Sequence, residues 1–330
     1  MPRIGVSPTR QQTTTYRPAR VTVVLITYIP HLEGYFAQRL DILKIVLQSL
    51  RAHTRVPYDL LIFDNGSCAS VVNYLREAQE AGEIDYLLLS QRNVGKIGAF
   101  QIAFPAAPGE IIAYADDDVL FYPGWLEASL RILETFPQAG MVSAVPVRDA
   151  AHRPHRALDA LLAAPPPGLE AYRERRIPDA WEADWALSTG RDPQAHLEAT
   201  RDHRDWVLRY QGVEAIGSAN HFQFLSPKAA LLQALPKTWS GRLMGQMVAL
   251  EERMDALGYL RLSTVERYVR HLGNALTPEL LDEIRSLGLA ADAQPVRLRP
   301  RKHWLLRIPG SGRLLWPLYR YLFRVLHGVE

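Results

Sequence analysis

Short apolar runs alternate with segments of helical periodicity from residue 21 to residue 145. The first run, residues 21–27, is rich in β-branched side chains and suits a central parallel strand. Further strands are predicted over residues 58–63, 84–89, 111–116 and 140–145, and helices over 39–53, 71–79, 95–104 and 125–136. The short connections between them predict an α/β fold with a doubly wound, mostly parallel sheet.

Three consecutive aspartates, Asp116, Asp117 and Asp118, follow directly on the apolar run that begins at Ile111. They fall at the C-terminal end of a predicted strand, which is where ligands bind in open α/β sheets. Crowded carboxylates repel one another unless a cation neutralises them, and Mg²⁺ or Mn²⁺ prefers such oxygen ligands. The pattern therefore favours a divalent metal that holds a diphosphate over a simple acidic turn.

Composition limits the class of protein. The 330 residues are 48% hydrophobic, which is ample for a core, and no run reaches the roughly 20 apolar residues of a membrane span. Residues 1–20 lack the apolar stretch of a signal peptide, and the single cysteine, Cys68, excludes an internal disulfide framework. A cytoplasmic protein is the simplest expectation.

Basic residues are concentrated at the two ends of the chain. Residues 297–330 carry eight Lys and Arg against one acid, and residues 1–20 carry four Arg and no acid, which leaves 26 basic and 34 acidic residues between them. An acidic body argues against a nucleic-acid binder. The apolar and basic residues of 297–330 instead suggest an amphipathic segment that lies on a membrane at its inner face, or one that packs on the domain or on a second subunit.

The remaining chain divides into segments of different character. Residues 1–20 are expected to be a flexible basic tail, and 21–147 an α/β half that binds the ligand. Residues 148–212, with several Pro, Arg and Trp, indicate a partly helical insertion that could cover the site. Residues 213–296 return to the same domain, with an interrupted strand over 212–225, a helix over 243–257, short strands over 259–264 and 268–272, and a helix over 277–290.

The order of four motifs resembles the nucleotide-sugar glycosyltransferases of the GT-A fold, family 2 type. The motifs are V-T-V-V-L-I-T-Y from Val21, I-F-D-N-G-S from Ile62, R-N-V-G-K-I-G-A-F from Arg92 and Y-A-D-D-D-V from Tyr114. The resemblance continues through Gly217-Ser218, the sequence E-E-R-M-D-A-L-G-Y and R-H-L-G-N, and so covers roughly residues 21–274. It implies a metal-dependent transfer of a sugar from a UDP or GDP donor to a glycan or lipid-linked acceptor.

The resemblance also assigns roles to individual residues. It places Thr27, Tyr28, Asp64, Asn93, Gly95 and Lys96 around the nucleotide. It makes Asp116 and Asp118 the two ends of the family's D-x-D motif, with Asp117 between them, so that Asp116 faces the ribose and Asp118 the metal. His271 would complete the metal shell. Each has a simpler alternative: Asp64 as a turn residue, Asn93 as a left-handed residue, Lys96 as a solvated charge and His271 as a core histidine.

The general base is the point at which the chain departs from this family. An inverting enzyme needs a carboxylate to take the proton of the acceptor hydroxyl, and the position that usually carries an acidic pair holds Gln246-Met247. The nearest acids, Glu251 and Glu252, are neighbours about 100° apart on a helix, so at most one faces the site. Glu251 is the first candidate, and Glu252, Asp255, Asp184 in the insertion or a retaining mechanism remain alternatives.

Two other functions remain open. A nucleotidyltransferase would share the sheet, the aspartates and the metal, although the chain has no G-x-x-x-x-G-K-[ST] loop and no G-x-G-x-x-G after its first strand. A binding protein that has lost catalysis would account for Gln246-Met247. Oligomerisation is open in all three cases.

Overall fold

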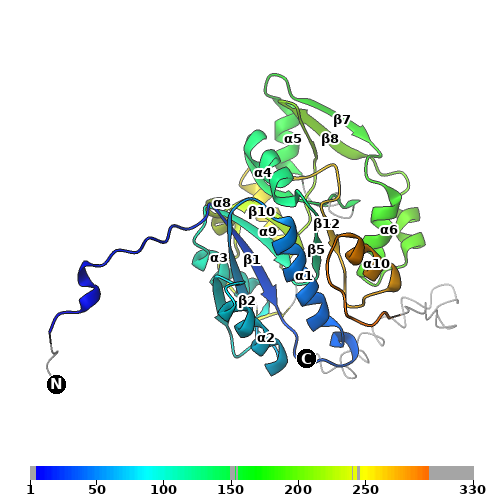
Figure 1. Ribbon diagram of the computed structural model, residues 1–330. Coiled ribbons are helices and arrows are strands. Elements are labelled where there is room, and N and C mark those ends of the chain that lie inside the picture. Colours follow the sequence, from blue (N-terminus) through cyan, green and yellow to red (C-terminus); the bar gives the residue numbers. More distant parts are fainter. Residues whose placement is uncertain (1–4, 149–152, 154, 240, 244–245, 297–330) are drawn as a thin grey trace.

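A computed structural model describes residues 5–148, 153, 155–239, 241–243 and 246–296. Its centre is a ten-stranded sheet with the order β3-β2-β1-β4-β10-β6-β11-β9-β8-β7 (Figure 1). The basic amphipathic segment predicted over 297–330 lies outside the described residues. The N-terminal segment, which includes a 3₁₀ turn at Pro8–Gln11, extends outward from the domain in Figure 1. It reaches the domain at Tyr16, whose hydroxyl donates a hydrogen bond to Asp59.

Four neighbouring strands that run parallel confirm the doubly wound half predicted from the sequence. They are β1 (Val21–Thr27), β2 (Tyr58–Asp64), β3 (Tyr86–Leu89) and β4 (Ile111–Asp116), joined by α1 (Arg39–His53), α2 (Ala69–Glu80) and α3 (Gly95–Ala106). All seven residues of β1 are buried, because neighbours cover the strand on both faces. The carboxyl ends of β1, β2 and β4 therefore meet at one edge.

The other half of the sheet mixes directions. β10 (Gln223–Pro227) runs antiparallel to both β4 and β6 (Ala139–Ser143), and β11 (Leu260–Ser263) runs parallel to β6. β9 (Val213–Ile216), β8 (Asp205–Tyr210) and β7 (Glu170–Glu174) then extend the edge as antiparallel neighbours. β7, β9 and β10 point one way and the other seven strands point the opposite way, so most strands share one direction, as predicted.

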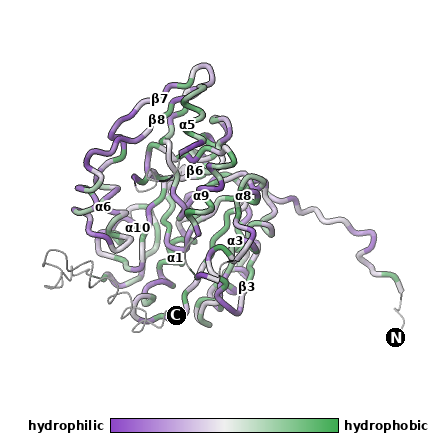
Figure 2. The backbone as a smooth tube through the Cα atoms, turned by 180° about the vertical axis from the view of Figure 1, so that it is seen from behind, coloured by the Kyte–Doolittle hydropathy of each residue, from purple (hydrophilic) through white to green (hydrophobic). Residues whose placement is uncertain are grey.

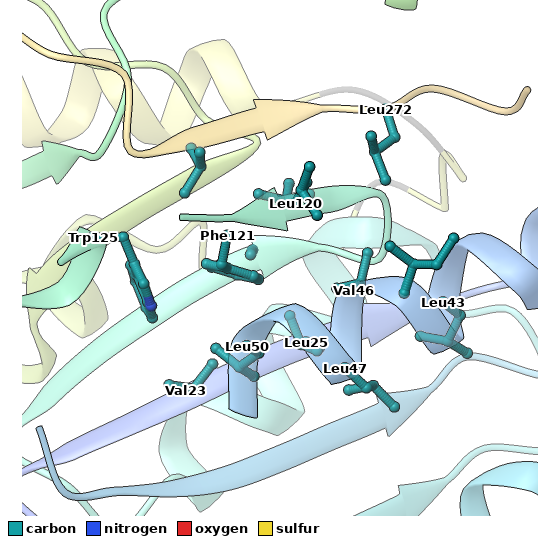
Figure 3. Close-up of a cluster of buried hydrophobic side chains, with 14 of the residues drawn as sticks. Val23, Leu25, Leu43, Val46, Leu47, Leu50, Leu120, Phe121, Trp125 and Leu272 are labelled. Carbon is teal, nitrogen blue, oxygen red and sulfur yellow. The ribbon is translucent and has the colours of Figure 1, made fainter. Parts of the chain in front are cut away.

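Helices cover both faces of the sheet, as the alternation of side chains along β1 requires. Val21, Val23 and Leu25 pack with α1, α2, α4 (Trp125–Thr135) and α10 (Pro278–Ser286). Figure 3 shows part of this cluster, in which leucines and Val46 of α1 lie together with Val23 and Leu25 of β1 and with Phe121 and Trp125. Val24 and Ile26 pack on the opposite face with α3, α8 (Lys228–Ala234) and α9 (Met247–Ala256).

A small second sheet positions the end of the aspartate strand. β5 (Val119–Phe121) follows Asp118 directly and pairs with β12 (Val269–His271). In this pairing His271 lies opposite Val119, and the backbone N–H of Leu272 donates to the Asp118 carbonyl at 2.8 Å. Residues more than 150 positions apart in the chain therefore meet beside the aspartates.

The insertion differs from its prediction in one respect. Besides α5 (Arg156–Ala163), α6 (Asp179–Ser188) and α7 (Pro193–Ala199), it contributes the outermost strands β7 and β8 to the main sheet. The β7 side chains are mostly exposed, and Figure 2 draws this strand mainly in the hydrophilic colour. α6 leads back toward β12, so the insertion also touches the aspartate edge.

Candidate functional site

The three aspartates lie at the C-terminal end of β4 and in the turn to β5. Asp116 is the last residue of β4, and its backbone N–H donates to the Phe222 carbonyl at 2.8 Å. Asp117 and Asp118 are 6% and 8% exposed. Buried carboxylates of this kind require cations or hydrogen-bond donors at close range.

Arg39, the first residue of α1, supplies one such cation. Its guanidinium is buried, donates to Asp117 and to Asp118 Oδ2 (2.6 Å), and reaches the Gly273 carbonyl at 3.1 Å. Burial works against the charge of Arg39, but the two carboxylates outweigh it and hold the pKa of the guanidinium above its ordinary value. Arg39 thus neutralises much of the negative charge of Asp117 and Asp118, for which the sequence alone predicts a metal ion.

Lys96 supplies the second cation. Its Nζ lies 2.7 and 3.0 Å from the two Asp116 carboxylate oxygens, and the Tyr114 hydroxyl also donates to Asp116. The side chains of Lys96 and Asp116 are 13% and 25% exposed, the most open of the charged pairs around the aspartates. The three carboxylates are therefore held by different groups rather than by one shared ion.

Asp117 and Asp118 differ in their proton affinity. Burial raises the pKa of Asp117 above its ordinary value in spite of Arg39. Burial acts in the same direction on Asp118, but His271 and Arg39 outweigh it, so the pKa of Asp118 lies below its ordinary value. Asp118 is consequently the carboxylate that stays ionised and can bind a cation.

Asp118 and His271 together fit a metal ion. Asp118 Oδ1 is buried, has no hydrogen-bond partner among the described residues, and lies 3.5 Å from His271 Nε2. Ser188 Oγ of α6 lies 2.9 Å from His271 Nδ1, which leaves Nε2 directed at the carboxylate. In the part of the chain that the structure describes, no group of three His, Cys, Asp or Glu could hold a metal alone, so further ligands would have to come from the substrate or water.

The residues expected around the nucleotide lie at the neighbouring strand ends. Thr27 Oγ1 donates to Asp117 at the end of β1, and Tyr28 follows with its ring edge-on to Phe36. At the end of β2, Asp64 is 1% exposed and accepts the backbone N–H groups of Gly66 and Ser67 at 3.2–3.3 Å. That pattern is the turn-forming role that the sequence left as an alternative for Asp64.

Asn93 and Gly95 shape the loop that precedes α3. Asn93 Oδ1 accepts from Asn65 Nδ2 at 3.0 Å and from the Gly95 backbone N–H at 2.8 Å. Gly95 has φ +73°, and a Cβ there would overlap the carbonyl oxygen of Arg242. The loop is therefore tied to the end of β2 on one side and covered by residues 242–243 on the other.

Glu251 is buried in α9 and does not face an open surface. It is 1% exposed, with Oε1 2.7 Å from His221 Nδ1 and Oε2 3.2 Å from Arg261 Nη1. Glu252 is exposed on the next position of the helix. Asp184, the alternative from the insertion, is paired with Arg267 and Arg270 at 2.7 and 2.9 Å.

Sequence reasoning missed Arg39, Asn65, Ser188 and His221. Asn65 stands inside the motif I-F-D-N-G-S and could have been singled out with Asp64. Three buried aspartates also demand more positive charge than Lys96 supplies, which was a signal for an arginine. No local pattern marks Ser188 or His221, because each is brought to the site by a contact distant in sequence.

A hollow of about 250 Å³ lies where the insertion meets the loop after β9. Arg173, Arg204 and His155 line it together with Trp206 and Ser218. The Arg173 guanidinium stacks over the Trp206 ring at 4.6 Å. Its lining therefore combines basic and aromatic side chains with one acid, Asp205.

Comparisons with known proteins agree with the resemblance of the motifs. Residues 35–179 match the family model described as Glycosyl transferase family 2. An uncharacterized glycosyltransferase of Nostoc sp. (strain PCC 7120) is 27% identical over 103 residues, which are 31% of this chain and 32% of that protein. The match thus spans about a third of the length of this curated relative.

Three solved structures have a similar course of the chain. A Pyrobaculum calidifontis mannosyltransferase in complex with GDP-Man and Mn²⁺ has a TM-score of 0.42 at 18% identity, over 76% of this chain and 55% of that one. S. aureus TarS 1–349 has a TM-score of 0.43 at 11% identity, over 83% of this chain and 67% of that one. GalNAc-T7 with UDP, GalNAc and Mn²⁺ has a TM-score of 0.46 at 15% identity, over 77% of this chain and 44% of that one.

Proposed function

We propose that the chain moves a sugar from a nucleotide-diphosphate donor, a UDP or GDP sugar, to an acceptor hydroxyl, because residues 35–179 match the model of glycosyl transferase family 2. The observation that carries the proposal is the pair formed by Asp118 Oδ1, which lacks a hydrogen-bond partner among the described residues, and His271 Nε2. The pair lies at the carboxyl edge of the parallel strands, where donors bind in such sheets.

Asp118 and His271 would hold Mn²⁺ or Mg²⁺, with Asp116 close by. The metal would stabilise the negative charge that develops on the diphosphate as the bond to the sugar breaks. Arg39 keeps Asp118 ionised and in place, and Ser188 orients the His271 ring. Both supporting contacts fix the ligands before the donor arrives, which is the condition for tight binding of a metal–diphosphate pair.

The nucleotide would lie against the ends of β1 and β2 and the loop before α3. Thr27, Tyr28 and Asn93 would surround the base and ribose, and Asp64 would shape the turn beside them through its hydrogen bonds to Gly66 and Ser67. Lys96 and Asp116 form the most open of the ion pairs around the aspartates, so the ribose or the phosphates could exchange with either partner. Gly95 allows the close approach of backbone that this loop needs.

The acceptor would approach from the side of the insertion. The hollow beside Trp206 and Arg173 suits a sugar ring, because aromatic faces and arginines bind such rings and their anionic substituents. A glycan or a lipid-linked glycan fits this chemistry. Attack of its hydroxyl on the far side of the anomeric carbon would invert the configuration.

The test is incubation of the chain with Mn²⁺ and a panel of nucleotide sugars, with detection of the released product. Release of UDP or GDP supports the transferase, and its loss after addition of a chelator supports the metal. Release of pyrophosphate would instead identify a nucleotidyltransferase. Binding of the nucleotide sugar with neither product would identify a non-catalytic homologue, the outcome that Gln246-Met247 favours.

A further inference from the structure

His221 lies at the same edge of the sheet as the aspartates. It precedes β10, and its neighbour Phe222 accepts the backbone N–H of Asp116 through its carbonyl. The Phe222 ring also lies 5.2 Å, edge-on, from the His271 ring. His221 is therefore next in sequence to a residue that contacts both Asp116 and His271.

The environment of His221 is that of an oriented base. Its side chain is 35% exposed, whereas that of Glu251 is 1% exposed. Glu251 accepts the Nδ1–H of His221 at 2.7 Å, so the lone pair of the ring lies on Nε2, which points away from the carboxylate. A histidine held in one tautomer by a buried carboxylate is a recurring device for proton removal.

Glu251 is itself locked in place. Arg261 Nη1 lies 3.2 Å and Arg153 Nη1 3.6 Å from its Oε2, and the Arg261 side chain is 2% exposed. These arginines occupy the oxygen of Glu251 that does not face His221. The carboxylate can accept a hydrogen bond from imidazole, but its burial keeps it from an acceptor hydroxyl.

The position of Glu251 also accounts for the missing acid in α9. Met247 occupies the place where the motif resemblance expects a carboxylate, and Glu251 follows one turn later on the same face of the helix. The Glu251 carboxylate is buried there, so it can act on a group at the surface only through a second side chain. His221 is the group that it contacts.

We infer that His221 is the general base of the transfer reaction and that Glu251 is its positioning residue; this rests on the proposed function. Nε2 of His221 takes the proton of the acceptor hydroxyl as that oxygen bonds to the anomeric carbon of the donor. The bond from this carbon to the diphosphate oxygen breaks, and its electron pair leaves with the nucleoside diphosphate. The imidazolium, paired with Glu251, then releases the proton to solvent.

The experiment compares His221→Gln, His221→Ala and Glu251→Gln with the wild type on the donor that the panel identifies. Each is assayed for kcat, for donor dissociation constant and for melting temperature. Glu198→Gln is the matched control, because Glu198 lies on the exposed face of α7 and pairs only with the exposed Arg201 among the described residues. We expect His221→Gln to lower kcat about 10²- to 10⁴-fold, with donor affinity and melting temperature close to the wild type.

Two readouts separate catalysis from structural support. Free imidazole should restore part of the activity of His221→Ala, because it can enter the vacated space as a base, and it should leave Glu198→Gln unchanged. Glu251→Gln should lower kcat in the wild-type background but have little further effect in His221→Ala, because Glu251 acts through His221.

The outcomes are distinct. If the wild type transfers sugar and His221→Gln keeps its kcat, the base assignment is wrong while the proposed function stands. Additive effects of the two substitutions, or no rescue by imidazole, would also overturn it. If the wild type releases no nucleoside diphosphate from any donor, the proposed function fails and the assignment falls with it.

Discussion

At the scale of residues, the site is defined by how three neighbouring carboxylates are neutralised. Asp116 is paired with Lys96, whereas Asp117 and Asp118 share Arg39. One oxygen is left over, Asp118 Oδ1, and it faces His271. The protein thus supplies cations for stability and leaves a single carboxylate oxygen for binding.

Asp118→Asn should abolish metal-dependent donor binding while the chain still folds. The amide keeps an oxygen for the Arg39 hydrogen bond but loses the charge, so unfolding should become easier by only about 1–3 kcal/mol. Isothermal calorimetry of Mn²⁺ with nucleotide measures the first effect and urea denaturation the second. Asp282→Asn, at an exposed pair with Arg285, is the control. Unchanged Mn²⁺–nucleotide affinity in the Asp118 variant would remove Asp118 from the metal site.

Arg39→Met should be strongly destabilising. It leaves Asp117 and Asp118 buried beside each other without their guanidinium, and loss of one partner of such a buried group costs about 3–5 kcal/mol. Arg285→Met removes an exposed pair instead and should cost about 0–1 kcal/mol. Urea denaturation of both variants measures these changes in unfolding free energy. Equal decreases in the two variants would mean that Arg39 is not the cation that stabilises the buried aspartates.

At the scale of elements, the strands and helices around the aspartates were predictable and the insertion was not. The bounds of β1 and α1 are those expected from the sequence, because a strand covered on both faces is one apolar run and α1 has a regular apolar stripe. β7 carries the residues E-A-Y-R-E, which are mostly exposed and have no apolar alternation. Its strand conformation comes from pairing with β8, a contact that local sequence cannot reveal.

The site shows the same division. Asp64 ends β2, Asp116 ends β4, and Asn93 and Lys96 lie in the segment after β3, because a parallel sheet brings these motifs to one edge. Their roles in binding stay predictions. Their partners depend on long-range packing: Arg39 is presented by the first turn of α1, and His271 by the pairing of β12 with β5. Whether a carboxylate such as Glu251 is open or buried is likewise decided only by the packing of α9 against α5, α8 and β11.

Gly95→Ala should damage the loop that begins α3. Gly95 and Gly190 share φ +73°, so alanine should cost about 1–2 kcal/mol of backbone strain at either position. Only at Gly95 would the new Cβ also overlap the Arg242 carbonyl; at Gly190 no described atom lies within 4 Å. Gly95→Ala should therefore lose more unfolding free energy than Gly190→Ala and should also weaken nucleotide binding. Equal losses of unfolding free energy in the two variants, with unchanged nucleotide affinity, would show that the loop accommodates a Cβ at Gly95 without strain from Arg242.

Asp205→Asn should loosen the anchor of the insertion in a pH-dependent manner. Asp205 is 2% exposed and accepts the backbone N–H groups of Arg176 and Ile177 at 2.9 and 3.1 Å. Burial tends to raise the pKa of Asp205, but hydrogen bonds from His203 and these backbone groups outweigh it and hold the pKa below its ordinary value. A depressed pKa means that the carboxylate stabilises the fold above its unfolded-state pKa of about 3.9, and that this contribution is lost as the pH falls through the folded-state value.

The wild type should therefore exceed Asp205→Asn by about 1–3 kcal/mol in unfolding free energy at neutral pH, and the difference should shrink in acid. Thermal or urea unfolding at several pH values measures it. Asp202→Asn, whose side chain is 93% exposed, is the control and should match the wild type throughout. A difference that is constant with pH would show that the charge of Asp205 is not what anchors the segment.

At the scale of the whole molecule, charge is divided between an acidic body and basic ends. Residues 21–296 carry 26 basic and 34 acidic side chains, while residues 297–330 carry eight basic residues and one acid. In the described part of the chain no helix is long and apolar enough to cross a membrane. A charge division of this kind would orient the protein at an anionic surface, with the basic segment toward it and the body away from it.

The full chain should sediment with vesicles that contain anionic lipid, and a chain that ends at Gln294 should not. In residues 297–330 the sequence places Trp304, Trp316 and Tyr319 among leucines, with arginines threaded between them. Aromatic side chains favour the membrane interface, and each basic residue near an anionic surface contributes about 1 kcal/mol. Vesicles of neutral lipid and a series of salt concentrations are the controls, because the electrostatic part should weaken as salt rises. If both chains sediment equally, or if the shortened chain loses its cooperative melting transition, the segment belongs to the folded domain or to a subunit contact, and a lipid-linked acceptor loses its main support.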